Sequence, residues 1–120
     1  MRRPVAAIAL ALLVALGLSA CGGSSSTPAG PLPTKRIDIT VHGDSVDPNG
    51  SRVDVAVGQR IELDVTADAP GEIHVHSSPE QELHYDQGST TLALKPFQAP
   101  GIITVESHTL NKVILQLKVS

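Results

Sequence analysis

Residues 53–63 read VDVAVGQRIEL, and this stretch decides the fold class. Apolar side chains recur at every second position on both sides of Gly58. A period of two is typical of β-strands that bury one face, and glycine suits the turn between two such strands. The stretch therefore predicts two short strands joined by a tight turn.

The same alternation continues outward in both directions from this stretch. Residues 37–41 (IDITV) alternate before it, and five further segments with strand character follow it, at residues 72–76, 82–86, 90–94, 101–107 and 113–119. Pro-Gly and Gln-Gly pairs separate several of them. No segment after the N-terminal region shows a helical period. Seven to eight short strands in one domain at residues 35–120 predict an all-β fold, an antiparallel β-sandwich or a small barrel.

The N-terminus has the layout of an export signal. Two arginines precede an apolar run at residues 5–18, and the run ends in Leu18-Ser19-Ala20-Cys21. This motif resembles the bacterial lipobox, in which the cysteine is acylated and the chain is cut before it. The resemblance implies a lipoprotein signal peptide at residues 1–20 and a lipid (palmitate) anchor on Cys21. It also implies export to the extracytoplasmic face of the cell membrane. The alternatives are an ordinary signal peptide cut after Ala20 and an uncleaved anchor.

Composition limits the partners of the exported chain. Residues 21–34 join the acylated cysteine to a Gly/Ser/Pro-rich segment that is typical of a flexible tether. Without residues 1–20 the chain keeps 7 basic and 12 acidic side chains, a net charge of −5. This charge argues against nucleic-acid binding and against electrostatic docking to anionic lipid. Membrane attachment is therefore expected to come from the acyl chains. Because Cys21 is the only cysteine and Met1 the only methionine, no disulfide or sulfur ligand is expected in the domain.

Two of the five histidines have a spacing that suits metal binding. His74 and His76 lie two apart in a predicted strand and therefore share one face. Two imidazoles on one face can chelate a divalent cation, and a third ligand from another strand, such as Glu106 or His108, would complete the site. The alternative interpretation is that the two histidines are solvated polar side chains. His84 is expected on a solvated strand face and in no functional role.

Catalytic motifs are not found in the sequence. Ser77 and Ser78 follow a histidine but lack a glycine-flanked nucleophile turn, and the chain has no phosphate-binding loop or zinc-protease motif. The expectation is a protein that is not an enzyme.

The order of the segments resembles the cupredoxin-like β-sandwich, a Greek-key fold. Residues 53–63 are similar to the strand–Gly–strand segment of that family. Residues 66–74 (TADAPGEIH) are similar to the loop and strand that end in its first copper-ligating histidine, a position that matches His74. Residues 96–105 (PFQAPGIITV) resemble the late Phe and Pro-Gly segment, and residues 115–119 resemble the closing strand.

The chain departs from the redox members of that family at the ligand positions. Residues 106–110 read ESHTL and contain neither the Cys nor the Met of an electron-transfer copper site, which excludes a blue-copper centre. The chain is more similar to thiolate-free relatives among bacterial extracytoplasmic lipoproteins, some of them associated with metal uptake. Their His-x-His and Glu-x-His motifs match His74, His76, Glu106 and His108.

Two function hypotheses follow. In the first, the lipid-anchored domain binds Cu(II) or Zn(II) through these four residues. In the second, the sandwich is a metal-free interaction module for another envelope protein. The distance of His108 from the pair of His74 and His76 discriminates between them.

Overall fold

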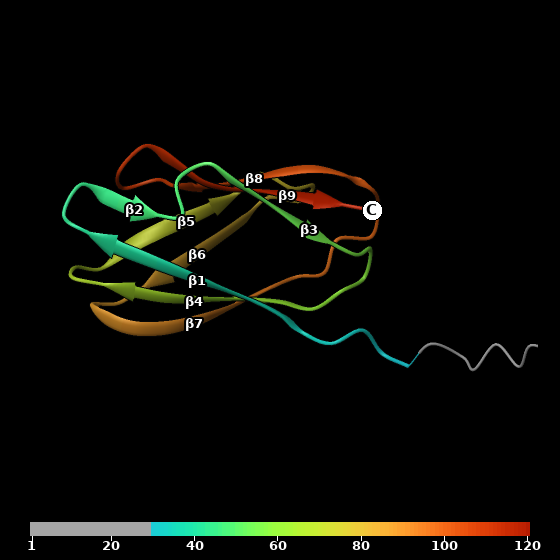
Figure 1. The fold of residues 1–120 in the computed structure, drawn as a ribbon. Coiled ribbons are helices and arrows are strands. Elements are labelled where there is room, and N and C mark those ends of the chain that lie inside the picture. Colours follow the sequence, from blue (N-terminus) through green and yellow to red (C-terminus); the bar gives the residue numbers. More distant parts are fainter. Residues whose placement is uncertain (1–29) are drawn as a thin grey trace, which may run out of the picture.

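The computed structural model describes residues 30–120, which form a β-sandwich of two sheets (Figure 1). Its nine strands are β1 (Lys35–His42), β2 (Ser45–Asp47), β3 (Ser51–Val55), β4 (Ile61–Ala67), β5 (Gly71–Val75), β6 (Gln81–Tyr85), β7 (Gly88–Leu94), β8 (Gly101–Ser107) and β9 (Lys112–Val119). Within residues 30–120 no helix is long and apolar enough to cross a membrane. The predicted signal peptide and Cys21 lie outside the described residues.

The first sheet has four strands in the order β2-β1-β4-β7. Strand β1 pairs with β4 in parallel, while β2 and β7 pair with their neighbours antiparallel. The alternation predicted for residues 37–41 and 61–65 is observed, because Ile37, Ile39, Leu63 and Val65 are buried and the residues between them are more exposed.

The second sheet has five strands in the order β3-β9-β8-β5-β6. Strand β5 lies between β6 and β8 and pairs antiparallel with both. Strand β3 pairs with β9 in parallel. This sheet carries the candidate site, since β5 and β8 are hydrogen-bonded neighbours in it.

The core between the two sheets is almost entirely aliphatic. Tyr85 and Phe97 are its two aromatic members, and the remainder are Ile, Leu, Val and Ala. The buried Tyr85 packs so closely on Gly71, its partner in strand pairing, that a side chain at residue 71 would collide with its ring. Burial raises the pKa of the Tyr85 phenol above its ordinary value.

A β-bulge interrupts the alternation in β9. The register between β8 and β9 shifts between Val105 and Glu106, so that Ile114 is an extra residue on β9. As a result Ile114 and Leu115 are adjacent and both fully buried. The backbone N–H of Gly50 lies 3.0 Å from the carbonyl oxygens of both Val113 and Ile114, which holds the β2–β3 turn against the bulge.

The predicted all-β sandwich is confirmed, with two differences of detail. The sheets are mixed rather than purely antiparallel. Between β1 and β4 the chain forms β2 in the first sheet and β3 in the second, and on its return β4 runs parallel to β1. There are nine strands instead of seven to eight, because β2 has three residues and is too short to show a period.

Candidate functional site

Histidine and glutamate alternate on the outer face of β5, β6 and β8. On β5 the side chains of Ile73 and Val75 enter the core, which turns His74 to the outer face. The strand register then places Glu82 of β6 on one side of His74 and Glu106 of β8 on the other. The burial pattern of β5 therefore places His74 on the face of its strand that points away from the core.

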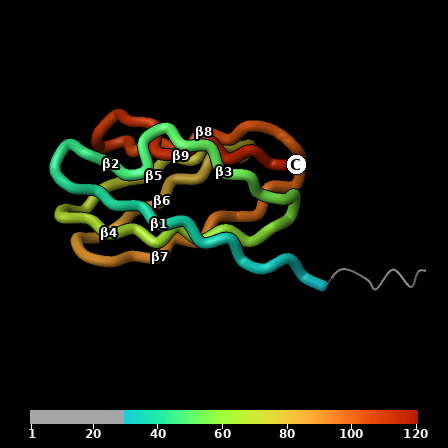
Figure 2. The backbone as a smooth tube through the Cα atoms, in the orientation of Figure 1, coloured from blue at the N-terminus to red at the C-terminus, as the bar shows by residue number. Residues whose placement is uncertain are grey.

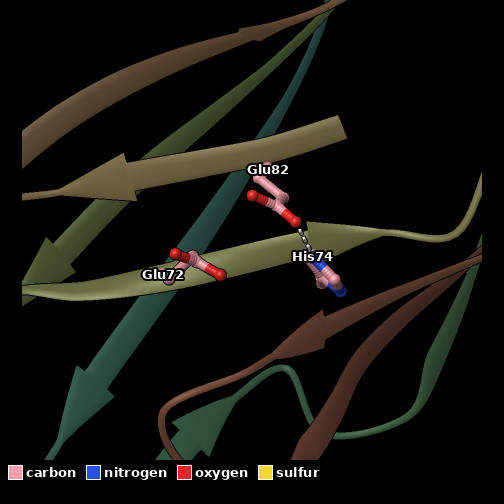
Figure 3. Close-up of side chains that lie close together, drawn as sticks. All are labelled: Glu72, His74 and Glu82. Carbon is pink, nitrogen blue, oxygen red and sulfur yellow. Dashed lines mark hydrogen bonds and ion pairs between the residues drawn. The ribbon is translucent and has the colours of Figure 1, made fainter. Parts of the chain in front are cut away.

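Three residues on this face could hold one metal ion. Glu72, His74 and Glu82 each offer a ligand atom, and these three atoms lie within 4.8 Å of one another (Figure 3). The Nε2 of His74 is 2.8 Å from the Oε1 of Glu82, which is hydrogen-bonding distance. The side chain of His74 is only 18% exposed, whereas that of Glu82 is 61% exposed.

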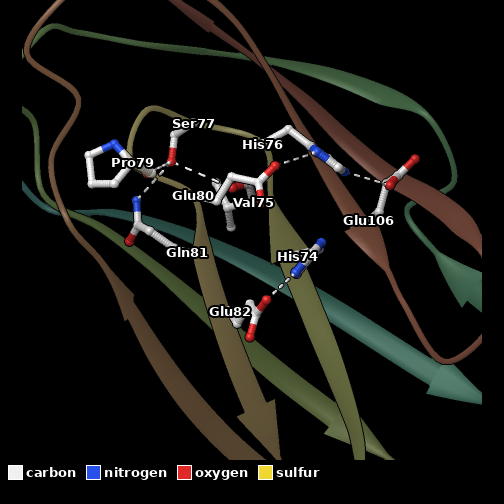
Figure 4. Close-up of polar contacts among 9 residues, drawn as sticks. All are labelled: His74, Val75, His76, Ser77, Pro79, Glu80, Gln81, Glu82 and Glu106. Atoms are coloured by element: carbon white, nitrogen blue, oxygen red, sulfur yellow. Dashed lines mark hydrogen bonds and ion pairs between the residues drawn. The ribbon is translucent and has the colours of Figure 1, made fainter.

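The other predicted site residues flank this group. The ring of His108 lies 5.1 Å from that of His74 and the ring of His76 lies 5.5 Å from it, measured between centroids. His76 contacts two carboxylates, with Nε2 2.6 Å from Glu106 and Nδ1 3.4 Å from Glu80 (Figure 4). The structure thus brings the four predicted residues to one face, while the tightest group around His74 is completed by two glutamates.

His84 lies on the same face as the candidate group. Its side chain is 76% exposed, in agreement with the expected solvated face, and its Nδ1 is 3.3 Å from Glu72. His42 is in the other sheet, where its Nδ1 contacts Asp68 at 3.0 Å. It provides a natural control for experiments on the candidate site.

The carboxylates around His74 change its acidity. The hydrogen bond to Glu82 raises the pKa of His74 above its ordinary value, and the negative charges of Glu82, Glu80 and Glu72 add to this effect. Partial burial of the imidazole opposes it. The same hydrogen bond lowers the pKa of Glu82. Without a metal ion, the pair is therefore a carboxylate with an imidazole that readily protonates.

The donors on this face suit a metal ion without sulfur ligands. Imidazole nitrogen and carboxylate oxygen are ligands for Zn(II) and Cu(II). Residues 30–120 contain neither Cys nor Met, so the copper–thiolate centre of redox cupredoxins does not fit this domain.

Glu72 and Glu82 were not predicted as ligands from the sequence. Glu82 lies in a different strand, β6, and its position opposite His74 depends on the turn between β5 and β6. In the observed hairpin, each residue of β5 pairs with the residue of β6 that is equally far from Ser78 in the sequence. His74, four positions before Ser78, therefore faces Glu82, four positions after it. The Ser-Ser-Pro turn at residues 77–79 was the one signal that could have revealed this register.

Comparison with known proteins supports the fold. No protein-family model and no curated protein sequence matches the chain. Among solved structures, auracyanin from the photosynthetic bacterium Roseiflexus castenholzii matches with a TM-score of 0.51 and 13% identity, over 72% of this chain and 97% of auracyanin. A multicopper oxidase matches with a TM-score of 0.52 and 17% identity, over 76% of this chain. A heme-copper terminal oxidase matches with a TM-score of 0.50 and 18% identity, over 72% of this chain.

The matches establish the fold of the domain. The chain spans 46% of the multicopper oxidase chain and 65% of the terminal oxidase chain, but nearly the whole of auracyanin. At these identities the likeness shows the fold alone. The described residues form a cupredoxin-like β-sandwich, as the sequence resemblance implied.

Proposed function

We propose that this protein is a non-enzymatic, lipid-anchored extracytoplasmic protein whose cupredoxin-like domain binds Cu(II) or Zn(II) at His74. The observation that carries the metal site is the convergence of ligand atoms from Glu72, His74 and Glu82 within 4.8 Å. His76, His108 and Glu106 border this group and supply further donors on the same face.

A metal ion that binds at this face must replace the hydrogen bond between His74 and Glu82. His74 must be a neutral imidazole to donate its lone pair, so the ion competes with the proton that Glu82 stabilises. Glu82 changes from hydrogen-bond acceptor to ligand. The carboxylates also offset the charge of the ion, which distinguishes this face from an isolated pair of surface histidines.

The lipid anchor is proposed from the sequence. A basic pair, an apolar run and a lipobox-like Leu18-Ser19-Ala20-Cys21 occur together at the N-terminus. Acylation at Cys21 would leave the domain on a Gly/Ser/Pro-rich segment outside the membrane.

A metal-free interaction module for another envelope protein is the second candidate. It is favoured by the way histidines and glutamates on the face pair with one another. His74 contacts Glu82 at 2.8 Å, His76 contacts Glu106 at 2.6 Å and His84 contacts Glu72 at 3.3 Å. These pairs satisfy the side chains without an ion and present a polar surface of imidazoles and carboxylates to a partner.

Calorimetric titration discriminates between the two candidates. The full chain, purified in a non-ionic detergent without a histidine tag and stripped with a chelator, is titrated with Zn(II) and with Cu(II). We expect His74→Ala to weaken binding by at least about tenfold, since loss of a group that merely supports a ligand already costs ~10–100-fold. His108→Ala should weaken binding less.

His42→Ala is the matched control, because it removes an exposed, carboxylate-paired histidine from the other sheet. It should bind both ions as the parent does. Equally weak binding by the parent and all three variants would favour the interaction module.

A further inference from the structure

The exposed apolar side chains of the domain gather at one end of the sandwich. Within residues 30–120 the exposed large hydrophobic residues are Leu32, Val57 and Ile102, which are 47%, 37% and 51% exposed. Leu32 precedes β1, Val57 follows β3, and Ile102 lies near the start of β8. We call this the proximal end; it comprises residues 30–34, the loops at 56–60, 76–80 and 95–100, and the start of β8 at residues 101–102. Figures 1 and 2 show the segment that leads into β1 and the C-terminus at this end.

Hydrogen bonds join the proximal segments into one surface. The side-chain amide of Gln59 donates to the carbonyl of Pro33 at 2.9 Å, and the N–H of Gly58 donates to the carbonyl of Phe97 at 2.8 Å. Between the loops at 76–80 and 95–100 lies a mainly apolar cleft of about 430 Å³, whose lining includes Pro79, Phe97 and Pro100. These hydrogen bonds connect the proximal segments, so the exposed apolar side chains belong to one continuous surface rather than to separate loops.

Charge is distributed unevenly between the two ends. The proximal segments contain two basic side chains, Arg60 and Lys95, and one acidic side chain, Glu80, and the C-terminal carboxylate lies at the same end. The loops at the opposite, distal end, at residues 43–44, 48–50, 68–70, 86–87 and 108–111, contain three aspartates and no Lys or Arg. Although the chain as a whole is acidic, its proximal end is therefore apolar and close to neutral, while the distal loops are acidic.

We propose that the proximal end docks onto the surface of a lipid bilayer. The docking rests on the membrane anchor proposed above, because Cys21 lies only nine residues before Gly30 and Gly30 is at the proximal end. Nine residues span at most about 30 Å, so an acylated Cys21 holds this end next to the membrane at high local concentration. Leu32, Val57 and Ile102 then enter the interface between headgroups and acyl chains.

The charges fix the orientation of the docked domain. Arg60 and Lys95 lie close to lipid phosphates, whereas the aspartates of the distal loops are kept away from an anionic surface. The strands run from one end of the sandwich to the other, so the outer face of β5, β6 and β8 is directed sideways and stays open to solvent. The candidate metal group at His74 remains accessible in this orientation.

Tryptophan fluorescence tests the docking directly, because the chain contains no tryptophan. Ala99→Trp places a reporter in the proximal loop at 95–100, and Asp44→Trp places the matched control in a distal loop. Each full chain is reconstituted into vesicles of phosphatidylcholine and phosphatidylglycerol whose acyl chains carry bromine. We expect blue-shifted and strongly quenched emission from Ala99→Trp and unquenched emission from Asp44→Trp.

A second variant separates docking by the native surface from insertion of the reporter itself. Leu32→Ser, Val57→Ser and Ile102→Ser together, in the Ala99→Trp background, should reduce the quenching by at least half. Flotation of the same vesicles reports the anchor independently. Two outcomes overturn the docking and leave the anchor intact, provided that the protein floats with the vesicles. In the first, the Ala99→Trp and Asp44→Trp reporters are quenched equally; in the second, the serine substitutions leave the quenching of Ala99→Trp unchanged. Protein that does not float at any lipid concentration overturns both.

Discussion

At the scale of single residues, His74 is the side chain on which the candidate site depends. It is the most buried histidine on the outer face of β5, β6 and β8, and its ring is close to those of His76 and His108. Its hydrogen bond to Glu82 both fixes the imidazole and makes it more basic. The acid–base behaviour of His74 is therefore a measurable signature of the site.

The sign of this effect predicts how the domain responds to pH. Because the pKa of His74 is raised from 6.5, the pair with Glu82 contributes stability that is fully present below pH 6.5 and is lost as pH rises through the raised value. The pKa of Glu82 is lowered from 4.5, so the contribution is also lost as pH falls through that lower value. Metal affinity should change in the opposite sense to this His74 contribution, and it should increase as pH rises through the pKa of His74.

Glu82→Gln tests this coupling, because it keeps the size of the side chain and removes its charge. The pKa of His74 should fall toward its ordinary value. Titration of the imidazole resonances by NMR measures it, with the resonance of His42 as the internal control. An unchanged titration of His74 in the variant would contradict the hydrogen bond to Glu82.

At the scale of secondary-structure elements, close packing of β5 against β6 positions the face that carries His74. Gly71 begins β5 opposite Tyr85 of β6, and the buried tyrosine ring occupies the space where a side chain at residue 71 would lie. A Cβ atom there would be 2.5 Å from Cζ of Tyr85 and closer still to its hydroxyl oxygen. The first residue of β5 must therefore be glycine for the two strands to pair as they do.

Gly71→Ala should consequently destabilise the domain. Overpacking of this kind costs about 1–3 kcal/mol in free energy of unfolding. Gly101→Ala is the matched control, since Gly101 also begins a strand but no atom lies within 4 Å of the position that its Cβ would take; it should change stability by less than about 0.5 kcal/mol. Urea denaturation measures both, and equal stability of the two variants would contradict the close contact with Tyr85.

The elements also show how far the sequence could predict the structure. A period of two identified the longer strands, because each buries one face against the other sheet. It missed β2, which is too short to show a period, and it did not reveal that β1 and β4 are parallel, since pairing between distant strands leaves no local pattern. His74 and His76 could be placed on one face from their spacing alone. Glu82 could not be assigned to His74, because their contact depends on the register of the hairpin.

At the scale of the whole molecule, the domain is proposed to work beside a membrane to which its N-terminus is attached. The lipobox-like motif predicts that the mature chain begins at Cys21 and carries fatty acid there. Mass spectrometry of the protein purified from a bacterial host that processes lipoproteins should show this modification, and the chain should partition into detergent.

Cys21→Ala should abolish the acylation and release the protein from the detergent phase. A parent chain that carries no lipid and is cut elsewhere would contradict the anchor. This outcome would leave the metal site untouched, because all its residues lie in the described domain.

The central claim is that a cupredoxin-like sandwich here carries a sulfur-free His/Glu metal site centred on His74. The most direct test is the combined visible and electron paramagnetic resonance spectrum of the chain with one equivalent of Cu(II), for the parent, His74→Ala and His42→Ala. The parent and His42→Ala should show one bound ion with hyperfine coupling to imidazole nitrogen and only a weak visible band, since no thiolate is available. His74→Ala should lose that signal. An intense blue band, or identical spectra from His74→Ala and the parent, would contradict the account.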